Sequence, residues 1–229
     1  MPIDEASRYC HFIINNDAMV EAPQQADLIK TFQSGTIDEK KKALQQLIKL
    51  ISNDENYPRL LMPVLTNLQM LPDHSIKKLL FLYWEIVEKT NVDGSVKDEI
   101  TLAVNALRKD LDSPNEFVRG RTLRLVAKIS VQQIIEDLVD AVITNLQHRN
   151  CYVRRNAIMS IYAIYEKFGV EQVENCIDDL ENILITESDM STKRNAFLLL
   201  FNLDQERCLK YLQNLMQSED PVSEIGDIF

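Results

Sequence analysis

The sequence predicts an all-α fold, a right-handed α-solenoid of HEAT- or armadillo-like helical pairs with roughly eleven helices. One observation is composition: only 5 of the 229 residues are Gly and 7 are Pro, which favours helices over a β fold. The other is a repeat, because Val118-Arg119 recurs as Val153-Arg154 at an offset of 35 residues. A helix that recurs at this period is typical of a solenoid, in which stacked pairs complete one another's core.

Capping signals divide the first half of the chain into helices. Thr36 and Glu39 form a capping box before an amphipathic stretch, which marks a helix start. Asp73 and Ser95 are good N-cap residues for two later helices. The expected helices therefore cover 24–34, a stretch from Thr36, a stretch from Pro58, 76–89, and Ser95 to Leu111.

The helix that carries the repeat begins near residue 113. Ser113 is expected as its N-cap, Pro114 fits the first helical position, and Glu116 closes a capping box. Further helices are expected near 131–147, from Asn150, and near 171–186, 188–202 and 204–217. We identify no credible strand and no Gly- or Pro-rich linker. We therefore expect one continuous array over residues 23–229, preceded by an N-terminal extension, residues 1–22.

A basic residue recurs near the start of five of these helices. Lys193 occupies the same position in a further copy of the repeat, 39 residues after Arg154. The five side chains could form a ligand-binding ladder, or they could bond acidic and carbonyl groups of the neighbouring repeat. We favour the second interpretation for all five: Lys40, Lys77, Arg119, Arg154 and Lys193.

Two further residues have a structural and a functional interpretation. Gly120 lies inside a helix, which indicates close helix packing more readily than approach of a ligand. Trp84 could anchor an interface, but a place in the core or lining a groove is the better interpretation.

Composition and motifs exclude several function classes. The net charge of −10, from 25 basic and 35 acidic residues, disfavours nucleic-acid binding. The cysteines are scattered as in a reduced, intracellular protein, and the histidines have no metal-ligand spacing. The sequence contains no phosphate-binding glycine motif, and we expect neither a signal peptide nor a membrane span. We expect a cytoplasmic protein that is not an enzyme and has no catalytic residues, cofactor or metal.

Several segments together resemble a known family. They are Asp73-His-Ser-Ile-Lys-Lys-Leu-Leu, Pro114-Asn-Glu-Phe-Val-Arg-Gly, Tyr152-Val-Arg-Arg-Asn-Ala and Lys193-Arg-Asn-Ala-Phe. Over residues 25–229 the chain resembles the N-terminal trunk of the coatomer β-subunit family, which has the adaptin N-terminal, HEAT-like fold. The trunk of the clathrin-adaptor β-subunits is a related, weaker match.

The resemblance implies a scaffold subunit of the COPI vesicle coat, acting in Golgi-to-ER and intra-Golgi transport. It implies the δ-subunit and other coatomer subunits as partners, and recruitment to Golgi membranes and COPI vesicles by a GTP-bound Arf-family GTPase. Because such subunits are much longer, we expect this chain to be an N-terminal fragment. A clathrin-adaptor β-type trunk, another HEAT scaffold or a transport receptor is the alternative.

The resemblance also implies a GTPase-binding segment, Ile100–Asn105. The contact positions of the related adaptor trunks fall here on Thr101 and Val104, which are three apart and share a helix face. Arg108 lies one turn further along. Thr101 departs from the aliphatic residue of the adaptors, and Val104, four residues after Ile100, could equally pack in the core.

Overall fold

The computed structural model describes residues 24–53, 57–69, 71–217 and 226. Eleven α-helices lie in this part of the chain, which confirms the all-α prediction. Contacts divide the chain into two compact units, Met1–Leu79 and Leu80–Phe229, and each is described by itself. The expected N-terminal extension, residues 1–22, lies outside the described residues.

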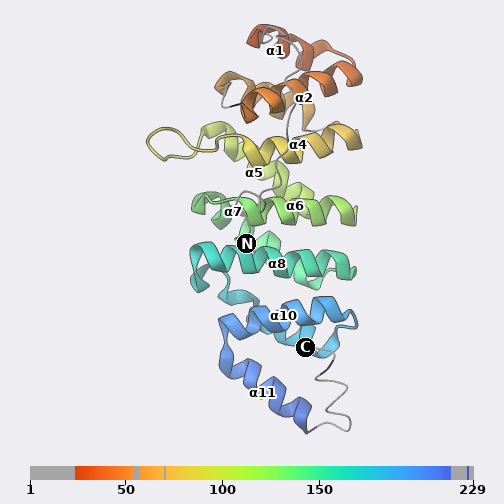
Figure 1. Cartoon of the computed structure of the whole chain (residues 1–229), viewed down its shortest axis with the longest axis vertical. Helices are drawn as coiled ribbons and strands as arrows, with labels where there is room; N and C mark the ends of the chain where they lie inside the picture. Colours follow the sequence, from red (N-terminus) through yellow and green to blue (C-terminus); the bar gives the residue numbers. More distant parts are fainter. Residues whose placement is uncertain (1–23, 54–56, 70, 218–225, 227–229) are drawn as a thin grey trace, which may run out of the picture. The chain divides into compact units, whose positions relative to one another are not determined.

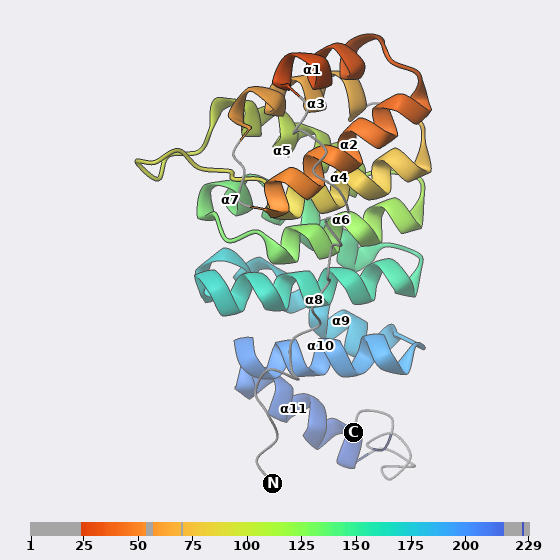
Figure 2. The same cartoon turned by 45° about the horizontal axis from the view of Figure 1, so that its top comes forward.

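The first unit contains three complete helices and a short 3-10 turn (Figure 2). The helices are α1 (Gln25–Ser34), α2 (Ile37–Ser52) and α3 (Leu61–Leu68), and the turn is Pro58–Leu60. α1 packs against both α2 and α3. The capping box is confirmed: Thr36 N donates to Glu39 Oε2 at 2.8 Å, and Glu39 N donates to Thr36 Oγ1 at 3.4 Å.

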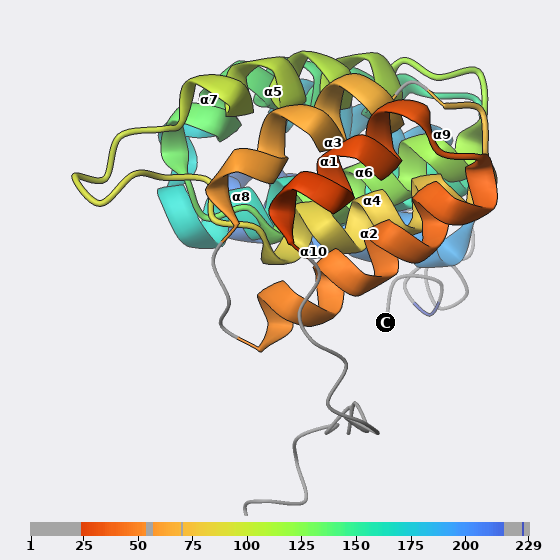
Figure 3. The ribbon, with the colours of Figure 1, turned by 90° about the horizontal axis from the view of Figure 1, so that it is seen from above.

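The second unit is a stack of helical pairs, as the solenoid prediction requires. It holds the residues of α4 (His74–Ile86) from Leu80 onward, followed by α5 (Asp98–Leu111), α6 (Glu116–Lys128), α7 (Gln132–Thr144), α8 (Cys151–Phe168), α9 (Ile177–Thr186), α10 (Met190–Leu203) and α11 (Gln205–Met216). α6, α8 and α10 lie side by side (Figure 1). α5 and α7 lie on the opposite side of this layer (Figure 3).

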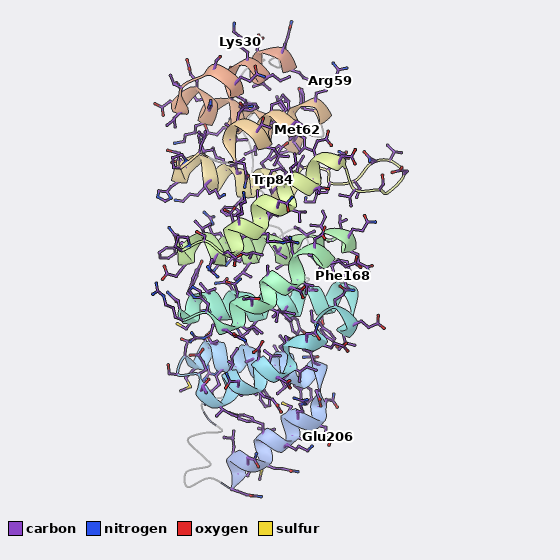
Figure 4. The ribbon with its side chains drawn as sticks, turned by 180° about the vertical axis from the view of Figure 1, so that it is seen from behind. Lys30, Arg59, Met62, Trp84, Phe168 and Glu206 are labelled. Atoms are coloured by element: carbon purple, nitrogen blue, oxygen red, sulfur yellow. The ribbon has the colours of Figure 1, made fainter. Side chains whose placement is uncertain are left out.

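The core of the second unit lies between these two layers. Trp84 of α4 is 3% exposed and lies beside α5 (Figure 4), which confirms the core interpretation. α8 is the most deeply packed helix, with buried Val153, Ala157, Ile158, Ile161 and Ile164. Each buried aliphatic side chain of this kind contributes about 1.5–3 kcal/mol, so packing stabilises these helices more than propensity does.

The start of α6 differs from the prediction. α6 begins at Glu116, and Asn115 is its N-cap, with Oδ1 accepting from Phe117 N at 2.9 Å. Ser113 and Pro114 precede the helix, and Ser113 Oγ accepts instead from Asn115 N at 3.2 Å. The predicted capping box of Ser113 and Glu116 is wrong because Asn115, an equally good cap, lies nearer the first helical turn.

The start of α5 also differs, because a hairpin precedes it. Thr90 and Val96 form an isolated antiparallel bridge, and Asn91 N donates to Ser95 O at 2.7 Å. Gly94 turns the chain with φ 86°. Ser95 therefore belongs to the hairpin, α5 begins at Asp98, and its N-cap is Lys97, whose side chain makes no capping hydrogen bond.

Candidate functional site

The three residues predicted to bind a GTPase lie on α5, but they differ in exposure. Thr101 is exposed, whereas Val104 is only 4% exposed. Val104 lines a small apolar cavity of about 10 Å³ with Trp84, Ile100 and Leu107. Its side chain is therefore part of the packing beneath α5, and Thr101 is part of the surface above it.

The surface of α5 carries Arg108 together with two residues that sequence reasoning did not single out. Leu102 is 50% exposed, and Asn105 is also exposed. Thr101, Leu102, Asn105 and Arg108 follow helical spacing, so they form one continuous strip. The Arg108 guanidinium donates through Nη2 to the carbonyl oxygen of Asp137, which ties α5 to α7. Periodicity could have found this strip, because its positions fall between the buried Ile100, Val104 and Leu107 in the helical pattern.

Arg119 bonds one helical pair to the next, as predicted, and we call such a side chain a structural rung. Its Nε donates to Ser113 O at 2.5 Å, and its Nη1 donates to Asn145 Oδ1 at 3.0 Å. Asn145 is fully buried, and its Nδ2 donates to Leu111 O at 3.2 Å and to Ala141 O at 2.7 Å. The guanidinium thus closes a network that joins the α5–α6 pair to the α7–α8 pair.

Arg154 makes the corresponding rung to the next pair. Its Nε donates to Glu187 Oε2 at 2.6 Å, and its Nη2 donates to Glu187 Oε1 at 2.8 Å. Glu187 Oε1 also accepts from the backbone N–H groups of Ser188 at 2.9 Å and Asp189 at 3.0 Å. Burial alone would raise the pKa of Glu187, but these hydrogen bonds outweigh it and hold the pKa below the ordinary value of 4.5. The rung prediction is confirmed for Arg119 and Arg154.

A polar cleft of about 430 Å³ lies beside the second rung. Its lining includes Gln147, His148, Asp179 and the Arg154–Glu187 pair, and Gln147 Nε2 donates to Asp179 Oδ1 at 3.0 Å. Burial and the nearby Arg119 lower the pKa of His148, which favours its neutral form. The Arg154–Glu187 pair and the Gln147–Asp179 hydrogen bond both join one helical pair to the next, so the cleft lies at a junction between repeats.

Sequence reasoning missed the acceptors of both rungs. Asn145 and Glu187 lie 26 and 33 residues after the arginines that they accept from. Asn145 directly follows α7, and Glu187 directly follows α9. Each of these helices is the first helix of the next helical pair. A polar residue at that position, following buried aliphatic residues, is the signal that would have identified both.

The two exposed helix surfaces of the second unit differ in charge. α7 exposes Glu136, Asp137 and Asp140, and α9 exposes Asp178. On the other layer, α6 exposes Arg121 and Arg124, and α10 exposes Arg194. Among the described residues, exposed acidic groups therefore gather on α7 and α9, and exposed basic groups gather on α6 and α10.

The described residues contain neither a metal-binding cluster nor a membrane-spanning helix. Within the described ranges, no group of three or more His, Cys, Asp or Glu side chains is placed to hold a metal ion. Among the same residues, no helix combines the length and the apolar character needed to cross a bilayer.

Comparison with known sequences gives a consistent match. Residues 21–224 match the family model described as the adaptin N terminal region. The chain is 41% identical over 227 residues to coatomer subunit beta of Rattus norvegicus, covering 97% of this chain and 23% of that protein. It is 42% identical over 222 residues to coatomer subunit beta of Toxoplasma gondii, covering 97% and 20%, and 40% identical to that of Dictyostelium discoideum, covering 96% and 23%. The chain thus spans less than a quarter of the length of these relatives.

Comparison with solved structures supports the fold alone. A designed armadillo repeat protein solved in complex with the peptide (KR)4 matches with a TM-score of 0.54 at 15% identity, covering 90% of this chain and 98% of that one. A chain from a structure on TOG–tubulin binding specificity matches with a TM-score of 0.55 at 18% identity, covering 89% and 81%. The repeat prediction is confirmed as an armadillo- or HEAT-like α-solenoid.

The family model matches almost the whole chain, and the stacked pairs have the architecture that the sequence repeat predicts. The three relatives come from a rodent, a parasite and a slime mould, and all three are described as coatomer subunit beta. This chain belongs to the adaptin N-terminal family, and within it the chain is similar to part of the coatomer β-subunits.

Proposed function

We propose that this chain is part of a non-enzymatic scaffold subunit of the COPI coat, which acts in Golgi-to-ER and intra-Golgi transport. The observation that carries the proposal is the similarity to coatomer β-subunits over 96% to 97% of the chain. A stack of helical pairs suits this role because each pair adds surface for partners without needing a catalytic centre. The partners are the δ-subunit and other coatomer subunits, and the coat holds the chain peripherally on Golgi membranes.

We further propose that a GTP-bound Arf-family GTPase binds the exposed strip of α5. Thr101 and Arg108 contact the GTPase directly, and Val104 supports the strip from beneath. Leu102 adds an apolar contact, since it is 50% exposed at the centre of the strip. Switch segments of such GTPases are ordered only by the γ-phosphate and Mg²⁺, so binding depends on the nucleotide.

The test is retention of the 229-residue chain on an immobilised Arf-family GTPase loaded with GTP analogue or GDP. The GTP form should retain more chain. Thr101→Glu should weaken this binding at least about tenfold, because it places a carboxylate in the contact. Gln133→Glu, an exposed substitution on α7, is the matched control. Equal retention by the two nucleotide forms, or by Thr101→Glu and wild type, contradicts the α5 site.

A substitution at Val104, such as Val104→Asp, would not be a clean test of the GTPase interface. The side chain is 4% exposed, so an aspartate there would be buried without a partner and would destabilise the fold. Its effect on GTPase binding would be confounded with unfolding.

The coat assignment has its own test. The tagged chain, expressed in cells, should co-purify with the coatomer δ-subunit. Co-purification with clathrin or with nuclear transport cargo would replace the proposal with one of the alternatives, whatever the outcome of the GTPase experiment.

A further inference from the structure

The hairpin that precedes α5 projects from the second unit (Figure 1 and Figure 3). It spans residues 89–97, and α5 follows it directly. Its tip is a turn over residues 91–94, closed by Gly94 N, which donates to Asn91 O at 3.0 Å. Val92, inside this turn, is fully exposed. An apolar side chain that projects into water in this way gains free energy from any apolar surface that covers it.

Hydrogen bonds stabilise the hairpin at its base and at its tip. At the base, Lys97 N donates to Lys89 O at 3.1 Å. At the tip, Ser95 Oγ and Ser95 N donate to Asp93 Oδ1 at 2.6 Å and 2.9 Å, and these bonds hold the pKa of the Asp93 carboxyl below its ordinary value. A segment that is already ordered loses little conformational entropy when a partner binds. The hairpin is therefore suited to presenting Val92 to a partner.

The exposed strip of α5 covers too little surface to bind a protein by itself. It consists of Thr101, Leu102, Asn105 and Arg108, whereas a stable interface takes about 20–30 residues from each partner. A GTPase that binds the strip must therefore also contact neighbouring elements. At the start of the strip this element is the hairpin, which ends four residues before Thr101. At the end of the strip it is α7, which Arg108 contacts.

The hairpin is the better of these two neighbours for an apolar contact. α7 exposes carboxylates, among them Glu136 and Asp140, which lose hydration when a partner covers them. Between residues 89 and 108, by contrast, the exposed large apolar side chains are Val92 and Leu102. The buried centres of protein interfaces are depleted in charge, so Val92 and Leu102 fit such a contact and the surface of α7 does not.

We propose that the hairpin is a second contact for the GTPase, with Val92 packed against an apolar patch on the bound protein. The inference rests on the proposed function, in which the GTPase binds the strip of α5. One small domain can reach both contacts. The strip is about 10 Å long at 1.5 Å per residue, and about 20 Å of extended chain separates Val92 from the start of α5. The whole span, about 30 Å, is the diameter of a small domain.

The test measures the affinity of the 229-residue chain for an immobilised Arf-family GTPase loaded with GTP analogue, by surface plasmon resonance. Val92→Asp should weaken binding at least about tenfold, because it places a charged carboxylate in the apolar contact. Val92→Leu, which keeps the side chain apolar, should bind within about twofold of wild type. The matched control is Val170→Asp, the same substitution at an exposed valine between α8 and α9, which should bind as wild type does.

Two comparisons separate failure of the hairpin contact from failure of the α5 site. If Val92→Asp binds as wild type does while Thr101→Glu binds more weakly, the hairpin contact is refuted and the α5 site stands. If wild type does not prefer the GTP form, the α5 site fails, and the hairpin contact fails with it. Since Val92 is fully exposed, circular dichroism should show Val92→Asp folded. Equal losses of affinity in Val92→Asp and Val170→Asp would also refute the contact, because added charge alone would then explain both.

Discussion

At the residue scale, the Arg154–Glu187 pair shows how adjacent helical pairs are joined. The Glu187 side chain is 2% exposed and that of Arg154 is 18% exposed, so each charge depends on the other for stabilisation. Removal of one partner from such a buried pair is costly because the remaining charge loses its compensation. The two bonds to backbone N–H groups fix the carboxylate at the start of α10.

Glu187→Ala should therefore destabilise the chain by about 3 kcal/mol in urea unfolding monitored by circular dichroism. Asp178→Ala is the control, because it removes a carboxylate that is 88% exposed from its pair with Arg207. This control should change stability very little. Equal losses in the two variants would show that the Arg154–Glu187 pair is not a joint.

The same residue predicts a pH dependence. Since the pKa of Glu187 is lower in the folded chain than its ordinary 4.5, the stabilisation is complete above that value and is lost as pH falls through the folded pKa. Between about pH 6 and pH 3 the wild type should lose more stability than Glu187→Ala does. Parallel pH curves for the two proteins would contradict this assignment.

At the element scale, α6 and α8 approach each other closely at Gly120 of α6. A Cβ added there would lie 2.3 Å from Cε1 of Tyr152 on α8. The Tyr152 ring is itself held by Phe117, with centroids 5.8 Å apart, and by Arg124. The close-packing interpretation of Gly120 is thus confirmed.

Gly120→Ala should destabilise the wild type by about 1–2 kcal/mol, because the ring or the helix must shift. In a Tyr152→Ala background the same substitution should stabilise by roughly 0.5–1 kcal/mol, since alanine is the better helix former. A double-mutant cycle by thermal or urea unfolding measures both values. The same sign in both backgrounds would exclude the contact as the reason for glycine.

Element positions could be predicted well from the sequence, and their exact starts less so. The caps at Thr36, Asp73 and Asn150 were predictable because each signal is local and has no competitor. The start of α6 was mispredicted where Ser113 competes with Asn115. Ser95 was mispredicted because the hairpin closed by the bridge between Thr90 and Val96 includes it, and this outweighs its capping preference.

The partners and the exposure of individual side chains were also hard to predict from the sequence. The repeat identified Arg119 and Arg154 as rungs, but their acceptors belong to a different helical pair, at distances that sequence spacing alone does not fix. The sequence leaves Val104 open between a contact and a place in the core, and its burial follows from the packing of this side of α5 against Trp84.

At the scale of the whole molecule, stability should follow the stack of the second unit. α8 contacts α6, α7 and α10, whereas α11 has a single buried residue, Cys208. In a solenoid each pair is stabilised by its neighbours, so opening should begin where neighbours are fewest.

Native-state hydrogen exchange should therefore find the slowest amides in the centre of α8, around Ile158–Ile164, and much faster amides in α11. Mass spectrometry of peptic fragments measures both regions in one experiment. Uniform protection along the second unit would instead indicate a single cooperative block.

The uneven distribution of charge between the two helix layers gives the second unit an electric dipole directed across its layers. A dipole of this kind turns a protein in the field of an approaching charged body before any atoms touch, and this raises the fraction of productive encounters. An acidic molecule would be oriented toward the arginines of α6, α8 and α10. A basic molecule would be oriented toward the carboxylates of α7 and α9. The two sides of the second unit would thus favour partners of opposite charge. At physiological salt this preference would act only at short range, because charges farther apart than the Debye length of about 8 Å are largely screened.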